Sequence, residues 1–458
     1  MRSMFRTLLC VGALALMLCS SVLAVETAGG ISIELNGEPL TFTDAAPQIV
    51  NDRTYLPFRA VFTALGFADE DITYQEATKT VSAVRDGLDI SMVIGEKQVS
   101  VTKDGQTTVL DTDAPAFIDP QLGRTYVPAR FVAEAAEYRV GWNGDTRTVI
   151  IDDVDAILEA NKETYKVLDL YLDYGRTFQK KNYQVEGSYY ADMLVGADLM
   201  EMGGTYSMLT EGSTKFDFKM RMEMGGSVAG ADLSAAIPEG VDLEMRGDMD
   251  SGAFYFKSDA LMTLMETGVE NLWFKMDLAG MMDSMAPQTG MSYTSLMTMS
   301  KDLLDGMDGE AYIDDMVRSM ALADTTMSAA DQLAMLNAML GDSAFIKDGS
   351  DYVAAYSDET ALMSMTVHTT NGRATGYTVT LIGGGEEGGM AMDVSMKDNK
   401  MAAAFEVVTG DTVMIMEMDG TYTVTTKAPA GQPGEEAAVL DMAEMMSAGA
   451  ATPVEPAA

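Results

Sequence analysis

The 458-residue sequence is short of histidine, cysteine and basic residues, and each shortage excludes a class of function. Its one histidine, His368, excludes zinc or copper centres built from several imidazoles and argues against His-based catalytic triads. Only 30 Lys and Arg stand against 70 Asp and Glu, a net charge of −40 at pH 7, so we expect no binding to nucleic acid. No catalytic motif is recognisable, and we expect a protein that is not an enzyme and holds no cofactor or metal.

Both cysteines, Cys10 and Cys19, lie in an N-terminal segment that has the features of a secretory signal. Residues 1–24 contain two arginines, an apolar run over residues 8–18 and small residues at the end, where cleavage is expected. We therefore expect the mature protein to be secreted or extracellular and to lack disulfides. Association with the cell wall is one location that this allows. An uncleaved membrane anchor is the alternative. No later run approaches the ~20 apolar residues of a membrane span, so the mature chain is not expected to be integral to the membrane.

An internal repeat occupies the first part of the mature chain. The segment RTYLPFRAV at residues 53–61 recurs as RTYVPARFV at residues 124–132. The match extends on both sides, which indicates a duplication. In each copy a strand ends at a proline that opens a short helix, so residues 25–152 are predicted to form a small module of duplicated hairpin, helix and hairpin. The flanking matches are TDAAP at 43–47 with TDAP at 112–115, and TKTV at 78–81 with TRTV at 146–149.

The repeated motif carries the candidate functional residues of this module. We interpret Arg59 and Arg130, at equivalent helix starts, as charges that pair to hold each helix to its sheet, with ligand binding as the alternative. The motif residues are Tyr55, Pro57, Arg59, Tyr126, Pro128, Arg130 and Trp142.

This motif, Tyr-(Leu/Val)-Pro-x-Arg followed by an aromatic residue and Thr-(Lys/Arg)-Thr-Val, resembles the copper amine oxidase N-terminal-like (stalk) domain across residues 31–152. The resemblance implies an extracytoplasmic spacer or binding module of Gram-positive envelope proteins. It does not imply amine oxidation, because that activity belongs to a separate catalytic domain with three histidine ligands.

The rest of the chain is rich in methionine: after residue 24, only Met92 precedes residue 153. Residues 153–181 predict one long amphipathic connecting helix. From 182 to 427, methionine and other apolar residues alternate with polar ones, which predicts an antiparallel sheet with one apolar face. A helical insertion is expected at about 292–342, and the fold class is α+β.

Hairpin turns are predicted at Asn371-Gly372, Asp398-Asn399 and Asp419-Gly420. Residues 428–458 are predicted to be a disordered acidic, Ala- and Pro-rich tail around a short helix at 435–446.

This order of elements resembles the half-barrel of outer-membrane lipoprotein carriers and related acyl-lipid-binding proteins, over residues 153–427. The resemblance implies a curved sheet around an apolar cavity, and flexible methionines would suit acyl chains. The alternative is that methionine replaces Leu and Ile in a solid core. The candidate apolar-ligand face consists of Phe218, Met220, Met222, Met245, Phe274, Met276, Met392 and Met416.

Weaker alternatives concern metals and catalysis. Recurrent Met-x-Met pairs suggest Cu(I), although methionines along one strand are too far apart to share an ion without neighbouring strands. The fragment Asp248-x-Asp250-x-Gly252 suggests calcium but lacks further ligands. His368 lies on the strand face opposite Met365 and Val367, so it is predicted to be exposed and without a catalytic role.

The sequence thus predicts a secreted, non-enzymatic cell-envelope protein, in which a stalk-like module accompanies a domain that binds an apolar, lipid-like ligand. One alternative is adhesion to cell-wall or other glycans through the module and exposed aromatics such as Trp142. Another is a hydrolase whose carboxylates form no recognised motif.

Overall fold

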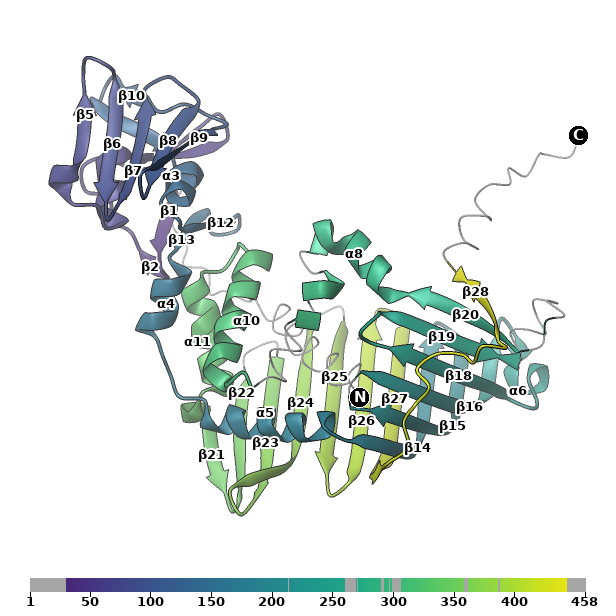
Figure 1. The fold of residues 1–458 in the computed structure, drawn as a ribbon. Helices are drawn as coiled ribbons and strands as arrows, with labels where there is room; N and C mark the ends of the chain where they lie inside the picture. The colour runs from purple at the N-terminus through teal and green to yellow at the C-terminus, as the bar shows by residue number, and fades with distance from the viewer. Residues whose placement is uncertain are drawn as a thin grey trace, which may run out of the picture. The chain divides into compact units, whose positions relative to one another are not determined.

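The computed structural model describes residues 30–212, 214–259, 269, 271–289, 292–295, 297–298, 306–357, 361–385 and 388–442. The predicted signal segment, residues 1–24, lies outside them. The described residues fall into two compact units: an N-terminal unit of residues 30–162 with Ile313–Leu336, and a C-terminal unit of Glu163–Tyr312 with residues 337–442. None of the described helices is long and apolar enough to cross a membrane. The fold class is α+β, as predicted (Figure 1).

The N-terminal unit contains three small sheets. Their strand orders are β12-β13-β1-β2, β10-β11-β4-β3 and β5-β6-β7-β8-β9, and all neighbours are antiparallel except β1 and β13. The strands are β1 (Ser32–Leu35), β2 (Glu38–Pro39), β3 (Gln48–Val50), β4 (Arg53–Pro57), β5 (Ile72–Gln75), β6 (Thr80–Arg85), β7 (Leu88–Val93), β8 (Gln98–Lys103), β9 (Gln106–Asp111), β10 (Phe117–Asp119), β11 (Arg124–Pro128), β12 (Arg139–Asn143) and β13 (Thr148–Asp152). The helices are α2 (Phe58–Ala64), the 3-10 turn η1 (Asp69–Asp71), α3 (Ala129–Ala135) and α4 (Val154–Ala160).

The duplicated motif forms the centre of this unit. Strands β4 and β11, one from each repeat, pair antiparallel, and each ends at the proline that opens α2 or α3. The helix predicted after Pro57 is therefore confirmed, and its Val61, Phe62 and Leu65 are fully buried in the core.

Corresponding contacts in the two copies of the motif tie the repeats to each other. Arg53 Nε donates to Asp113 Oδ2 at 2.7 Å, and its counterpart Arg124 donates to Asp44 at 2.5 Å. The buried tyrosines behave in the same way, since the Tyr55 hydroxyl donates to the Pro115 carbonyl and the Tyr126 hydroxyl to the Ala46 carbonyl. The match on both sides of the motif thus encodes a reciprocal interface between the copies.

The predicted single connecting helix over 153–181 is wrong, because two helices occupy this range. Helix α4 is capped by the Asp153 carboxylate and ends at Asn161, whose side-chain amide donates to the Ile157 carbonyl. An asparagine that satisfies a terminal carbonyl in this way favours a helix end. The second helix, α5 (Lys166–Gln179), belongs to the C-terminal unit.

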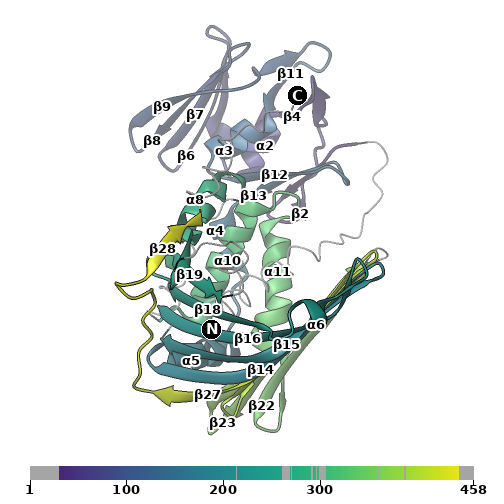
Figure 2. The ribbon, with the colours of Figure 1, turned by 90° about the vertical axis from the view of Figure 1, so that its right-hand side faces the viewer.

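The C-terminal unit is built on one large curled sheet, which fits the predicted half-barrel-like domain (Figure 2). Its order is β21-β22-β23-β24-β25-β26-β27-β14-β15-β16-β18-β19-β20-β28, with β17 beside β16, and every pair is antiparallel except β20 with β28. The strands are β14 (Asn182–Val195), β15 (Asp198–Glu211), β16 (Lys215–Val228), β17 (Ala231–Asp232), β18 (Val241–Asp248), β19 (Ala253–Ser258), β20 (Leu272–Asp277), β21 (Phe345–Asp348), β22 (Asp351–Ser357), β23 (Ala361–Thr370), β24 (Arg373–Gly385), β25 (Gly388–Lys397), β26 (Lys400–Thr409), β27 (Thr412–Thr425) and β28 (Ala438–Asp441).

The helical insertion begins earlier than predicted, at Leu278 and not near residue 292. The Asp277 carboxylate accepts the Gly280 amide at 2.9 Å, a side-chain cap that turns the end of β20 into the start of a helix. Met316 and Met320 of the insertion are buried, and residues 299–305 lie outside the described residues. Further helical elements are α6 (Leu233–Ala236), α8 (Leu278–Thr289), α10 (Gly309–Ala323), α11 (Ala329–Leu340) and the 3-10 turn η2 (Asp342–Ala344).

Two of the three predicted hairpin turns are confirmed. Asn371-Gly372 joins β23 to β24 and Asp398-Asn399 joins β25 to β26, all four with positive φ. Asp419-Gly420 instead lies inside β27, so the hairpin predicted there is wrong.

In the tail, residues 428–442 are described, and a strand, β28, stands where a helix was predicted. Residues 443–458 lie outside the described residues.

Candidate binding sites

The eight residues of the candidate apolar-ligand face all lie on one face of the large sheet. Phe218 lies opposite Met245, and Phe256 stands between Met245 and Phe274 in the same row. Three rows along, Phe405 stands between Met416 and Met392. The remaining members, Met220, Met222 and Met276, follow on the same side of β16 and β20, because side chains two apart share a strand face.

Helix α5 covers one end of this face over β23 and β24 (Figure 1). Its Tyr171 ring packs edge-on against Tyr377 at 5.1 Å, and its Phe178 packs against Tyr422 at 5.2 Å. The hydroxyls of Tyr174 and Tyr422 lie 3.1 Å apart, and burial together with this hydrogen bond raises the pKa of Tyr174 well above its usual value. This end of the sheet is therefore a packed aromatic core.

Away from α5 the same face is only partly covered. Met392 and Phe274 are 2% exposed, but Met414 is 41% exposed. The prediction offered a choice between a solid core and a lined cavity, and of its eight residues two are buried and six are half-buried. The half-buried members of the predicted face are Phe218, Met220, Met222, Met245, Met276 and Met416.

Candidate metal ligands do not gather in the described part of the chain, where no group of three or more His, Cys, Asp or Glu could hold an ion. Asp248 Oδ1 accepts the Asp250 amide at 3.0 Å, so the Asp-x-Asp-x-Gly fragment forms the β18–β19 turn. The Cu(I) alternative required methionines on neighbouring strands, because those along one strand are too far apart. Met193 stands between Met200 and Met414 on the two adjacent strands.

His368 is not exposed as predicted; its side chain is 14% exposed. Its Nδ1 lies 2.7 Å from Asp351 Oδ2 and its Nε2 lies 3.2 Å from Thr378 Oγ1. A register shift after His368 lets Asp351 also accept the Thr369 amide at 3.0 Å. The hydrogen bonds from His368 and Thr369 lower the pKa of Asp351 to about 2. The cluster links β22, β23 and β24, and a structural role accounts for its geometry.

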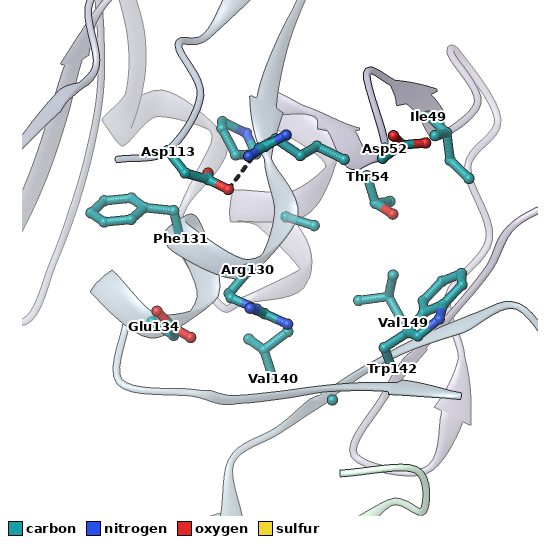
Figure 3. A pocket seen from close by; sticks show the side chains of 14 residues that line it. Ile49, Asp52, Thr54, Asp113, Arg130, Phe131, Glu134, Val140, Trp142 and Val149 are labelled. Carbon is teal, nitrogen blue, oxygen red and sulfur yellow. Dashed lines mark hydrogen bonds and ion pairs between the residues drawn. The ribbon is translucent and has the colours of Figure 1, made fainter. Parts of the chain in front are cut away.

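A cavity of about 730 Å³ lies in the N-terminal unit, within the size range of small-molecule sites. Residues from both repeats line it (Figure 3). Arg53 and Asp113, the ion pair that joins the repeats, form one side. Trp142 and Val149 form another, and Arg130 extends from α3 between them. Asp52, Thr54 and Glu134, which sequence reasoning missed, add polar groups to the lining.

The motif residues separate into structural and cavity-lining ones. Tyr55 and Tyr126 are buried and hydrogen-bonded to backbone carbonyls, and Arg59 donates to Asp69 and to the Ile72 carbonyl. Arg130, its counterpart, is exposed and makes no hydrogen bond or ion pair within the described residues. The prediction of a paired charge therefore holds for Arg59 and fails for Arg130.

The backbone of Trp142 is fixed by a hydrogen bond, and its side chain lines the cavity. Its amide donates to the Thr325 carbonyl at 2.9 Å, and its ring packs partly against the core. Within the described residues, no acceptor faces the indole N–H. An aromatic face with polar and charged groups around it is the composition of a site for a partly polar ligand, such as a saccharide or a small acid.

Comparison with known proteins supports the resemblance in this unit. Residues 34–151 match the family model of the copper amine oxidase N-terminal domain. No curated protein matches the chain.

Two solved structures show a distant similarity. One, titled "Lipid-protein interactions in lipovitellin", is 9% identical, with 56% of this chain and 26% of that one covered and a TM-score of 0.20. The isotype 1 transferrin binding protein B from serogroup B Neisseria meningitidis is 6% identical, with 77% and 37% covered and a TM-score of 0.11. This chain thus spans a minor part of either, and both scores are too low to enter the functional argument.

Proposed function

We propose that this chain is a secreted, non-enzymatic cell-envelope protein whose large sheet binds an apolar, lipid-like ligand. The observation that carries the proposal is the half-buried face of methionine and phenylalanine beyond the reach of α5. Covering such side chains with a ligand is favourable by roughly 25 cal/mol per Å² of apolar surface. Methionine adapts to irregular chains because it is unbranched and flexible.

Titration of the mature chain with a fluorescent fatty acid tests this proposal. Replacing Met222 and Met416 by Gln keeps the side-chain length but places two amides on the apolar face, and should weaken binding by about tenfold or more. The matched control replaces Lys219 and Glu417, exposed on the opposite face of the same two strands, by Gln, and should leave binding unchanged.

Two results would overturn the apolar-ligand proposal: no binding of the fatty acid by the unmodified chain, or equal effects of the two double variants. Export is tested separately. When a bacterial host expresses the full-length chain, protein recovered from the culture medium should begin at Val25. Activity profiling that finds a turnover abolished by one Asp or Glu substitution would contradict the non-enzymatic role.

A second candidate function is adhesion to glycans through the cavity that holds Trp142. The supporting observation is an aromatic side chain beside charged groups in a cavity of about 730 Å³. The chain should be retained on peptidoglycan or mucin glycans, and Trp142→Ala should release it. Tyr74→Ala, at the exposed corresponding position of the first repeat, is the control. Absence of any retention of the unmodified chain would exclude this candidate.

A further inference from the structure

The duplication has produced two corresponding cavities, and comparison of them shows what is special about the larger one. The second cavity, of about 240 Å³, is lined by the counterparts of the residues around Trp142. Arg59 stands where Arg130 does, Tyr74 where Trp142 does, and Phe58 where Ala129 does. Each cavity lies beside one of the two ion pairs that join the repeats. The two sites therefore began from the same architecture.

In the first repeat, the arginine is held by groups of the same repeat. Arg59 donates to Asp69 Oδ1 at 2.6 Å and to the Asp69 and Ile72 carbonyls at 2.8 and 2.9 Å. Asp69 belongs to η1, a turn of 3 residues after the helix. These contacts use both terminal nitrogens of the Arg59 guanidinium as donors, so the side chain has a structural role.

The second repeat lacks the segment that engages the arginine of the first. Between α3 and β12 there is no counterpart of η1, so Arg130 has neither the carboxylate nor the carbonyls that hold Arg59. Ala129 stands where Phe58 does and Phe131 where Ala60 does, so the aromatic ring takes a different place in the wall. The cavity of the second repeat is about three times larger, and its arginine lacks a hydrogen-bond or ion-pair partner within the described residues.

The other charges at this cavity do not neutralise Arg130. Asp113 is already paired with Arg53, and no ion pair joins Arg130 to Asp52 or Glu134 in the described structure. A guanidinium presents a planar fork of donors that matches a carboxylate. With a net charge of −40 over the whole chain, a densely charged polyanion would be repelled, which favours a ligand with one acidic group.

We propose that the Arg130 guanidinium binds the carboxylate of a singly acidic sugar whose ring stacks on Trp142. This inference rests on the second candidate function, glycan binding, and names the class of glycan. The Arg59 cavity is its structural counterpart and binds no sugar.

Calorimetric titration with two pairs of sugars tests the proposal on the mature full-length chain. The acidic sugars are sialyllactose and the disaccharide N-acetylglucosaminyl-N-acetylmuramic acid, and their neutral partners are lactose and N,N′-diacetylchitobiose. We expect one acidic sugar to bind about 10- to 100-fold more tightly than its neutral partner, the range for a charge-assisted hydrogen bond. The pair that shows the difference identifies the source of the carboxylate.

Variants assign the effect to Arg130. Arg130→Gln should remove the preference for the acidic sugar while leaving affinity for the neutral one unchanged, and Arg130→Lys should restore part of it. The melting temperature of Arg130→Gln should equal that of the unmodified chain, because Arg130 makes no hydrogen bond or ion pair within the described residues. The matched variant Arg59→Gln should melt lower, since it loses bonds to Asp69 and Ile72, and should keep the preference.

The outcomes separate this inference from the function on which it rests. Equal binding of acidic and neutral sugars, lost in Trp142→Ala, would overturn the role of Arg130 and leave glycan binding in place. A preference that survives in Arg130→Gln would also overturn it. No binding of any of the four sugars would overturn both.

Discussion

At the scale of single residues, Tyr206 lies against two glycines of the large sheet. A Cβ added at Gly420 would come within 2.4 Å of the Tyr206 hydroxyl oxygen, and one added at Gly187 would come within 2.7 Å of the ring and 1.9 Å of the Asp419 carbonyl oxygen. The hydroxyl donates to the Asp419 carbonyl at 3.0 Å, and burial raises the pKa of Tyr206 to about 12. The Asp419-Gly420 pair indicated a turn, but its glycine is required for close approach of a neighbouring side chain.

We expect Gly420→Ala to lower the free energy of unfolding by about 1–3 kcal/mol, because the new methyl overlaps the Tyr206 hydroxyl. In the double variant with Tyr206→Phe the overlapping oxygen is gone, so the two losses should be less than additive. Urea unfolding measures all three variants. Gly203→Ala, whose Cβ would meet only ordinary contacts from 3.5 Å, is the control. Strict additivity would contradict this account.

The His368 cluster predicts a pH dependence of stability. The pKa of Asp351 falls from 3.8 to about 2 in the folded chain, mainly through the hydrogen bond with His368. A lowered pKa of an acid stabilises the fold above the unfolded pKa, and this stabilisation is lost as pH falls from 3.8 to about 2. With the carboxylate 26% exposed, we expect a loss of about 1–2 kcal/mol. Asp351→Asn should remove that part of the acid-induced loss in urea titrations, and superimposable pH profiles would show that the pair contributes nothing.

At the scale of elements, alternation along the chain was sufficient to predict which residues share a sheet face. A period of two fixes the face whatever the order of the strands, so Phe218 and Met416 could be placed together without knowledge of the topology. Strand order, and the coverage of only one end by α5, depend on contacts between distant segments, which no local pattern encodes.

Boundaries of elements were predicted less well where single side chains decide them. Asn161 ends α4 and Asp277 starts α8 through hydrogen bonds to the backbone, and neither interrupts the apolar periodicity that predicted longer elements. In the tail, the alanine-rich composition favoured a helix, but Val439 and Leu440 pair with β20. Backbone pairing with an available strand outweighs helix propensity there.

The candidate site was partly predictable from the repeat. Aligning the copies brings Arg59 onto Arg130 and Tyr74 onto Trp142, and it also shows that the second copy lacks the three residues of η1. That gap is the signal that the two arginines differ. What the alignment could not supply is the reciprocal packing by which Arg53 of one repeat lines the cavity of the other.

At the scale of the whole molecule, the N-terminal unit is not a contiguous piece of sequence. Residues 313–336, from the helical insertion, complete it. Arg139 donates to the Ala321 carbonyl at 2.6 Å and pairs with Asp152, whose side chain is fully buried and accepts the Ala329 amide at 2.9 Å. Burial raises the pKa of Asp152 despite this pairing, so its charge depends on every donor around it.

We therefore expect a fragment of residues 25–162, which contains the whole repeat, to be less stable than the same segment in the intact chain. Without residues 313–336, Asp152 loses the Ala329 amide and Arg139 loses its carbonyl acceptors in the low-dielectric interior. Hydrogen exchange should show reduced protection of amides in β12 and β13, with smaller changes in β6 and β7, which belong to a separate sheet. In the intact chain, Asp152→Asn should weaken the same two strands, because removing one partner of a buried ion pair costs about 3–5 kcal/mol. Equal protection of β12 and β13 in the fragment and the intact chain would mean that the repeat folds independently of the insertion.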